Sequence, residues 1–173
     1  MLETTDEFLT QGVVKAVGKD IMLVTNRIQN GDIFVFDRTG KGLRKINRKG
    51  QGGEEYLSFA EIILDENNNE MFVKDYAARK ILVYDLYGTF KRSFKNADSC
   101  YYDNVFNYDR DNLIAYKNFG ATESKPSCHV IISKQDGSIT REIQIPFKEI
   151  KKTGCDKGGF YCNAWFCCNN PIS

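Results

Sequence analysis

The stretch IFVFDRTGKGLRKI, at residues 33–46, decides the fold because the chain repeats its pattern twice. The pattern recurs as ILVYDLYGTFKRSF at residues 81–94 and, more weakly, as VIISKQDGSITREI at residues 130–143. A glycine marks the same point in each copy, 48 and then 49 residues apart: Gly40, Gly88 and Gly137. The chain is therefore a tandem repeat, and the repeat unit determines its architecture.

Each copy contains four short segments with the character of β-strands. An apolar run leads into an Asp-x-x-Gly or Asp-Gly turn, and a more alternating, basic segment follows. Two further apolar segments precede each of these hairpins, separated by a polar turn at residues 18–20, 66–69 and 109–112. A repeat of this period that consists of strands is typical of a β-propeller blade. The sequence thus predicts an all-β fold of four-stranded antiparallel blades.

Several segments carry a resemblance to a known family. They are LETT at residues 2–5, FDRTG at 36–40, RKGQGGEEY at 48–56, VKD at 73–75 and KILVYD at 80–85. With them the chain resembles the six-bladed, NHL-like β-propellers of exported bacterial proteins, over about residues 2 to 147. The family usually has Pro-Gly where this chain has Gly53-Glu54, which affects only the stiffness of a loop. The resemblance implies a fold and an exported location, and it carries no catalytic motif.

The repeat predicts one partial propeller domain over residues 1–173, with about 3 to 3.5 blades of a six-bladed ring. The expected blades are residues 12–47, 58–95 and 102–147, followed by an incomplete fourth blade at 158–173. Because a propeller normally needs at least four blades, we expect this chain to be part of a longer one. The alternative is a homodimer in which two complete copies close one ring.

Charge and targeting signals limit the classes of partner. The formal net charge is +1, which gives no reason to expect a nucleic-acid partner. The N-terminus, MLETTD, has neither a secretory signal nor a transmembrane stretch. We expect an extracytoplasmic location, in the periplasm or at the cell surface, if the N-terminus is truncated. A cytoplasmic location is expected if the chain is complete.

The cysteines do not predict a metal site. Cys155, Cys162, Cys167 and Cys168 cluster near the C-terminus, at spacings that do not match paired zinc knuckles. The single histidine, His129, opens an apolar segment. We therefore expect no metal and no cofactor. A disulfide in an exported protein and an unpaired segment of an incomplete blade both remain open for the tail.

Loops at one end of the strands form the candidate binding site. The second-to-third strand loops and the connections between blades emerge on the same face, where binding residues of a rigid scaffold usually lie. The competing interpretation is that these side chains are solvated or pack between blades. The predicted ligand-facing residues are Arg48, Lys49, Gln51, Asp75, Tyr76 and Arg79.

The sequence favours a non-catalytic binding or interaction scaffold over an enzyme. Its carboxylates lie mainly in turns, and we identify no catalytic residue. The predicted partner is a protein, a peptide or a glycan. The alternative is a propeller-type hydrolase or lyase whose metal and catalytic residues lie largely in blades outside this sequence. Fold alone does not decide between them.

Overall fold

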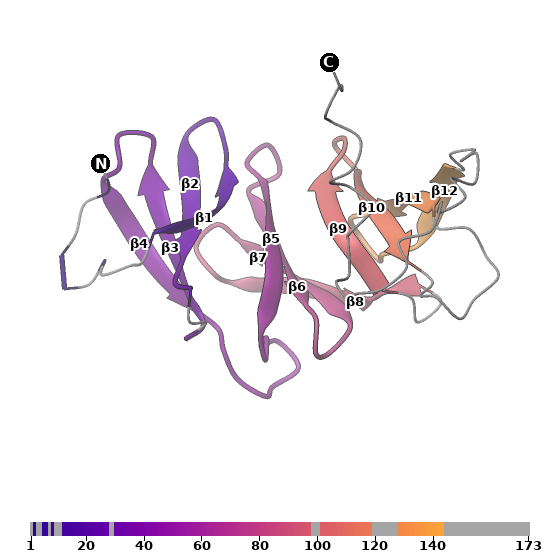
Figure 1. Ribbon diagram of the computed structural model, residues 1–173, viewed down its shortest axis with the longest axis horizontal. Helices are drawn as coiled ribbons and strands as arrows, with labels where there is room; N and C mark the ends of the chain where they lie inside the picture. Colours follow the sequence, from indigo (N-terminus) through magenta and orange to yellow (C-terminus); the bar gives the residue numbers. More distant parts are fainter. Residues whose placement is uncertain are drawn as a thin grey trace, which may run out of the picture.

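The computed structural model consists of three four-stranded antiparallel sheets, arranged side by side (Figure 1). It describes residues 2, 5, 6, 8, 12–27, 30–97, 101–118 and 128–143. Each sheet corresponds to one copy of the repeat, so the predicted all-β architecture of four-stranded antiparallel blades is confirmed. The expected fourth blade at residues 158–173 and the four clustered cysteines lie outside the described residues.

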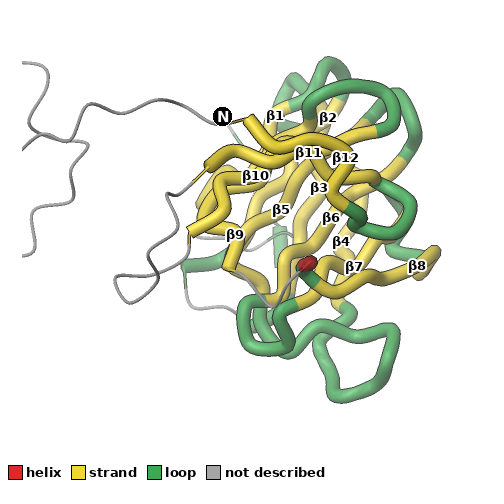
Figure 2. Tube along the Cα trace, turned by 90° about the vertical axis from the view of Figure 1, so that its right-hand side faces the viewer, coloured by secondary structure: helices red, strands yellow, loops and turns green. Residues whose placement is uncertain are grey.

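The strands of each sheet follow one another in chain order, as a meander. In the side view, the described chain is almost entirely strand and loop (Figure 2). The first sheet contains β1 (Val13–Val17), β2 (Ile21–Thr25), β3 (Asp32–Asp37) and β4 (Gly42–Asn47). The second contains β5 (Phe59–Asp65), β6 (Glu70–Asp75), β7 (Lys80–Asp85) and β8 (Phe90–Lys95). The third contains β9 (Tyr101–Asn107), β10 (Asn112–Asn118), β11 (Cys128–Ser133) and β12 (Ile139–Ile143).

The repeated aspartate closes the outer hairpin of the sheets. The carboxylate of Asp37 accepts hydrogen bonds from the backbone N–H groups of Thr39 (2.8 Å) and Lys41 (3.0 Å). Asp85 makes the equivalent contacts after β7. A hydrogen bond from the Thr39 hydroxyl, together with these N–H donors, lowers the pKa of Asp37. The turn is thus specified by local side-chain-to-backbone bonds, as the motif predicts.

Two apolar layers hold the sheets together. The first junction joins β1–β4 to β5–β8, and the second joins β5–β8 to β9–β12. Because β6 has a sheet on either side, every residue of this strand is buried. The first strands of the sheets lie together on the inner side, since β1 contacts β5 and β5 contacts β9. The first junction buries Leu23, Val35, Met71, Val73 and Leu82, and the second buries Phe72, Val83, Leu113, Val130 and Ile132.

An arginine on the outer strand repeats one contact at both junctions. Arg44 Nε donates to the carbonyl oxygen of Leu86 (2.9 Å), and Arg92 Nε donates to that of Lys134 (3.0 Å). Each arginine therefore binds the outer turn of the next sheet through its backbone. Arg141 is at the equivalent position of the third sheet, and its side chain is exposed.

Candidate functional site

The ends of the strands form two faces with different content. The loop face carries the β2–β3 and β6–β7 loops and the connection between the first two sheets, at residues 48–58. The turn face carries the β1–β2, β5–β6 and β9–β10 turns, which lie at the upper edge in Figure 1. The predicted ligand-facing residues belong to the loop face, and a pocket opens on the turn face.

Two buried tyrosines hold the connection at residues 48–58 in place. The Tyr56 hydroxyl donates to the carbonyl oxygen of Gly31 (2.6 Å) and accepts from the N–H of Arg48 (3.0 Å). Burial raises the pKa of Tyr56 to about 12, so its hydroxyl stays protonated and available as a donor. The Tyr84 hydroxyl donates to the carbonyl oxygen of Glu54 (2.7 Å). Sequence reasoning did not identify either tyrosine as an anchor.

The glycine-rich part of this connection folds around its own glutamate. The carboxylate of Glu55 accepts a hydrogen bond from the N–H of Gly52 (2.8 Å). A Cβ at Gly50 would overlap the same carboxylate. Glycine is therefore needed here so that the backbone can approach Glu55.

Three of the predicted ligand-facing residues lie on this connection, with different surroundings. Arg48 Nε donates to the carbonyl oxygen of Gly88 (2.8 Å), in the outer turn of the next sheet. Lys49 is exposed, and its backbone pairs with Tyr56 in an isolated bridge. Gln51 is exposed. All three residues are exposed, and Arg48 in addition contributes to the first junction.

Asp75 is buried and shapes the loop that follows it. Its side chain accepts hydrogen bonds from the N–H groups of Leu57 (2.7 Å) and Ala78 (3.0 Å). The residue is only 1% exposed, so it joins the connection at residues 48–58 to the β6–β7 loop. Its contacts are those of a structural aspartate, and its carboxylate does not face solvent.

The two remaining predicted residues form an exposed cluster with Tyr101. Tyr76 is 61% exposed, and its ring centroid lies 5.5 Å from that of Tyr101. The guanidinium carbon of Arg79 lies 4.5 Å from the Tyr101 centroid, which is a cation–π distance. Arg79 has a φ of 51°, in the left-handed region that non-glycine residues rarely adopt. The structure therefore brings together Tyr76, Arg79 and Tyr101, which we call the aromatic cluster.

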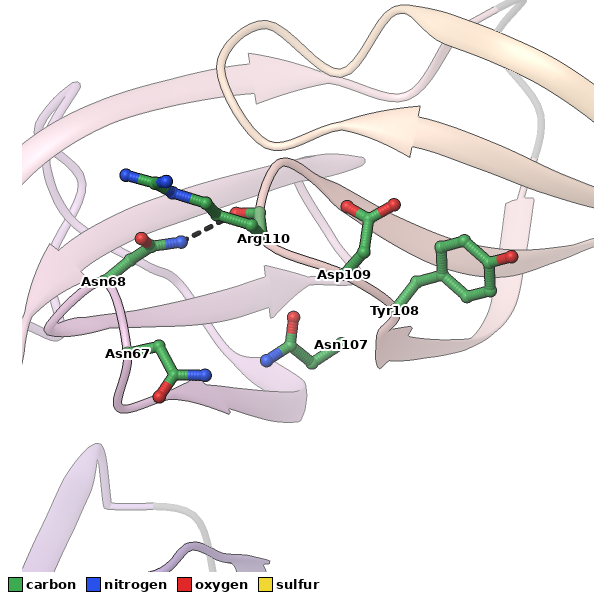
Figure 3. Close-up of a pocket in the computed structure, with 6 residues that line it drawn as sticks. All are labelled: Asn67, Asn68, Asn107, Tyr108, Asp109 and Arg110. Carbon is green, nitrogen blue, oxygen red and sulfur yellow. Dashed lines mark hydrogen bonds between the residues drawn. The ribbon is translucent and has the colours of Figure 1, made fainter.

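A pocket of about 500 Å³ opens on the turn face at the second junction. Its walls come from the β5–β6 turn and from the β9–β10 turn with the end of β9 (Figure 3). In this view the side-chain amides of Asn67 and Asn107 point toward each other. The lining residues are Asn67, Asn68, Asn107, Tyr108, Asp109 and Arg110. Sequence reasoning did not predict this pocket.

A buried lysine fixes the two walls of the pocket. Lys134 Nζ contacts the Asp65 carboxylate at 2.6 Å, and each side chain is only 2% exposed. The same ammonium donates to the carbonyl oxygens of Asp109 (2.6 Å) and Arg110 (3.2 Å). Asn68 Nδ2 bridges the walls too, since it donates to the Asp65 carboxylate (2.8 Å) and to the Arg110 carbonyl (2.7 Å). The ammonium thus has three acceptors, which compensate for its burial.

Asp109, the carboxylate in the pocket lining, already accepts hydrogen bonds from its own turn. Asp109 accepts hydrogen bonds from the N–H groups of Asp111 (2.9 Å) and Asn112 (2.7 Å) and from the Asn112 amide. The bond from the Asp111 N–H is the main cause of the lowered pKa of Asp109. Asp109 is therefore ionised at neutral pH, and its hydrogen bonds serve the turn.

A glutamate fills the corresponding place at the first junction. The Glu66 carboxylate accepts hydrogen bonds from the backbone N–H groups of Asp20 (3.0 Å), Ile21 (2.9 Å) and Lys19. A Cβ at Gly18 would overlap this carboxylate, so the side chain lies directly against the β1–β2 turn. Burial alone would raise the pKa of Glu66, but the three N–H donors outweigh it and lower the pKa.

The described residues contain neither a metal-binding group of side chains nor a membrane-spanning helix. Within the described ranges, no group of three or more His, Cys, Asp and Glu side chains is placed to hold a metal ion. The same part of the chain contains no helix with the length and apolar character of a membrane span.

Stacked four-stranded antiparallel sheets, each with its first strand on the inside, define a β-propeller. The chain belongs to the 6-bladed beta-propeller family, whose model matches residues 1–161. No curated protein matches the chain.

Two solved structures show the same fold. A "putative exported protein" from Bacteroides fragilis matches with a TM-score of 0.63 and 20% identity, over 84% of this chain and 41% of that one. The WD40 repeats of RRP9 match with a TM-score of 0.51 and 11% identity, over 77% of this chain and 39% of that one. The chain thus spans about two fifths of the length of each, and these low identities support the fold alone.

Proposed function

We propose that the protein is a non-catalytic binding module whose loop face takes up a peptide segment of a protein partner. The aromatic cluster is the observation that carries this proposal, because it exposes a tyrosine ring beside a guanidinium group. Tyrosine and arginine are enriched among the residues that dominate binding energy at protein interfaces.

The surroundings of the cluster support a preformed site. Asp75 joins the beginning of the β6–β7 loop to the connection at residues 48–58, through the N–H groups of Ala78 and Leu57, and Tyr76 follows directly. Tyr101 belongs to β9, so the cluster extends from one sheet to the next. A site held on a rigid scaffold loses little conformational entropy on binding. Lys49 and Gln51 remain proposed contacts on the same face.

A location outside the cytoplasm fits this proposal. The similar structure from Bacteroides fragilis carries the name of an exported protein, and we extend that location to this chain. The alternative, a propeller-type hydrolase or lyase, has no observation in its favour among the described residues.

The test is a selection from a phage-displayed library of random peptides against the full chain. Peptides enriched on the wild-type protein should lose at least tenfold in affinity for Tyr76→Ala and for Arg79→Ala. Tyr87→Ala is the matched control because Tyr87 is also exposed, at 69%, and lies in the β7–β8 turn. Failure to enrich any peptide, or equal binding to wild-type protein and Tyr76→Ala, would overturn the proposal.

A further inference from the structure

We infer that the pocket at the second junction binds a neutral saccharide, at a site separate from the loop face. The pocket lies between the β5–β6 and β9–β10 turns, at the opposite ends of the strands from the aromatic cluster. Its volume, about 500 Å³, falls within the range of about 300–1,000 Å³ that is usual for small-molecule sites.

The walls of this pocket are preorganised. Lys134 connects the end of β5 to the β9–β10 turn through the Asp65 carboxylate and two backbone carbonyl groups. Asn68 adds a second connection between the same two turns. Both connections are direct hydrogen bonds or ion pairs that join the two turns, so they set the separation of the walls. A ligand therefore meets a formed site and need not order the turns.

The lining has the chemistry that recognises hydroxyl groups. Side-chain amides such as those of Asn67 and Asn107 carry donors and an acceptor side by side, as a pair of neighbouring sugar hydroxyls does. Asn107 Nδ2 also donates to the carbonyl oxygen of Leu64 (3.4 Å), which orients its amide. Tyr108 is 49% exposed, so its ring and hydroxyl are both accessible. Among the described residues, neither the amide of Asn67 nor the hydroxyl of Tyr108 has a partner.

The charges of the lining favour a neutral ligand. Arg110 contributes one positive charge and Asp109 one negative charge, so the lining has no net charge. The ammonium of Lys134 is already compensated by Asp65. The lining therefore offers an anion no surplus of positive charge. A saccharide without charged groups does not need one.

The first junction shows how a side chain of this fold can fill the corresponding place between two turns. Glu66 is the first residue after β5, and Tyr108 is the first residue after β9. At the first junction Glu66 occupies the space against the neighbouring turn and binds its backbone N–H groups. At the second junction Tyr108 leaves a pocket instead. The exchange of glutamate for tyrosine thus replaces an internal contact with an accessible, amide-lined site.

The test uses the full chain on a printed array of neutral oligosaccharides: glucans, mannans, xylans and N-acetylglucosamine oligomers. At least one should bind, with a dissociation constant at or below the millimolar range in calorimetry. Asn67→Ala and Tyr108→Ala should each weaken that binding at least tenfold. In a two-dimensional NMR titration, the backbone amide signals of residues 66–68 and 107–110 should shift on addition of the sugar.

Two further variants keep the test decisive. Tyr108→Glu places in the third sheet the residue that the second sheet has, and it should abolish binding while the circular dichroism spectrum is retained. Tyr76→Ala, on the loop face, should bind the sugar as the wild-type protein does, so this result is independent of the peptide selection. The inference is overturned if no neutral oligosaccharide binds at millimolar concentration, if binding survives Asn67→Ala and Tyr108→Ala, or if only acidic sugars bind.

Discussion

The two junctions of this propeller are built from the same repeat, yet their turn faces differ. Both bury aliphatic and aromatic side chains, and both place an outer-strand arginine on the next turn. At the first junction, Glu66 fills the space beside the β1–β2 turn. At the second, Lys134 holds the walls of an open pocket. The apolar layers therefore maintain the stack, and the polar turns are where the junctions acquire different properties.

The largest effect should come from removing the ammonium that is specific to the second junction. Lys134→Met leaves the Asp65 carboxylate buried without its partner, which should lower the free energy of unfolding by about 3–5 kcal/mol. Urea denaturation followed by circular dichroism measures the change. The control is Lys91→Met, whose side chain is 39% exposed in its pair with Glu70 and should cost less than about 1 kcal/mol. Equal losses for the two variants would mean that the buried pair does not determine the second junction.

Alanine substitution of the glycine in an outer turn tests the close packing that both junctions have. Gly88 has a φ of 90°, and a Cβ there would lie 2.6 Å from Ile46 Cγ2 of the preceding sheet. Gly137 is in the same situation against Phe94. Alanine at either position should cost about 1–3 kcal/mol, because it strains the backbone and overfills the junction. Thermal unfolding of both variants should show similar losses, and Gly53→Ala, whose added Cβ would have nothing within 4 Å, should stay close to wild type. A large cost at only one of the two sites would show that the layers are not equivalent.

The smallest effect concerns the carboxylate at the first junction, and it depends on pH. Glu66 has a pKa below its ordinary value of 4.5, so the folded state holds this carboxylate ionised more strongly than the unfolded state does. Its contribution is complete above pH 4.5 and is lost as the pH falls through the lower folded value. Glu66→Gln should cost about 1 kcal/mol at pH 7 and less at lower pH.

Urea midpoints of wild-type protein and Glu66→Gln, measured from pH 7 down to pH 3, check this expectation. The two curves should converge in acid. A difference that stays constant over the whole range would show that the hydrogen bonds of Glu66 do not depend on its charge.

The repeat made the fold predictable, because its turn signals and apolar runs are local in sequence. The outer turns at Asp37 and Asp85 could be predicted because each carboxylate binds N–H groups of its own turn. The roles of Glu66 and Tyr108 could not be predicted in the same way, since they depend on which turn of another sheet each side chain meets. Lys134 gives no local sign of burial, because its ion-pair partner Asp65 is distant in sequence.

The predicted ligand-facing residues show the same limit. Asp75 at the end of a strand can face solvent or bind backbone N–H groups, and only the position of Leu57 decides between these. The cluster of Tyr76 and Arg79 depends on Tyr101, from the next sheet. The sequence predicts Tyr76 and Arg79 as ligand-facing residues, but it gives no sign of their contact with Tyr101.

The contact of Arg44 and Arg92 with the next turn has a consequence for how the protein can diversify. Both guanidinium groups bind a backbone carbonyl oxygen, so the side chain at that position takes no part in the contact. The residue is Leu86 in one turn and Lys134 in the other, and the two hydrogen bonds have similar lengths, 2.9 and 3.0 Å. A position can therefore change from an aliphatic residue to a buried cation without loss of the link between sheets. The side chain at this position is thus set by its own surroundings, because Leu86 packs in the apolar layer of the first junction and Lys134 pairs with Asp65 at the second.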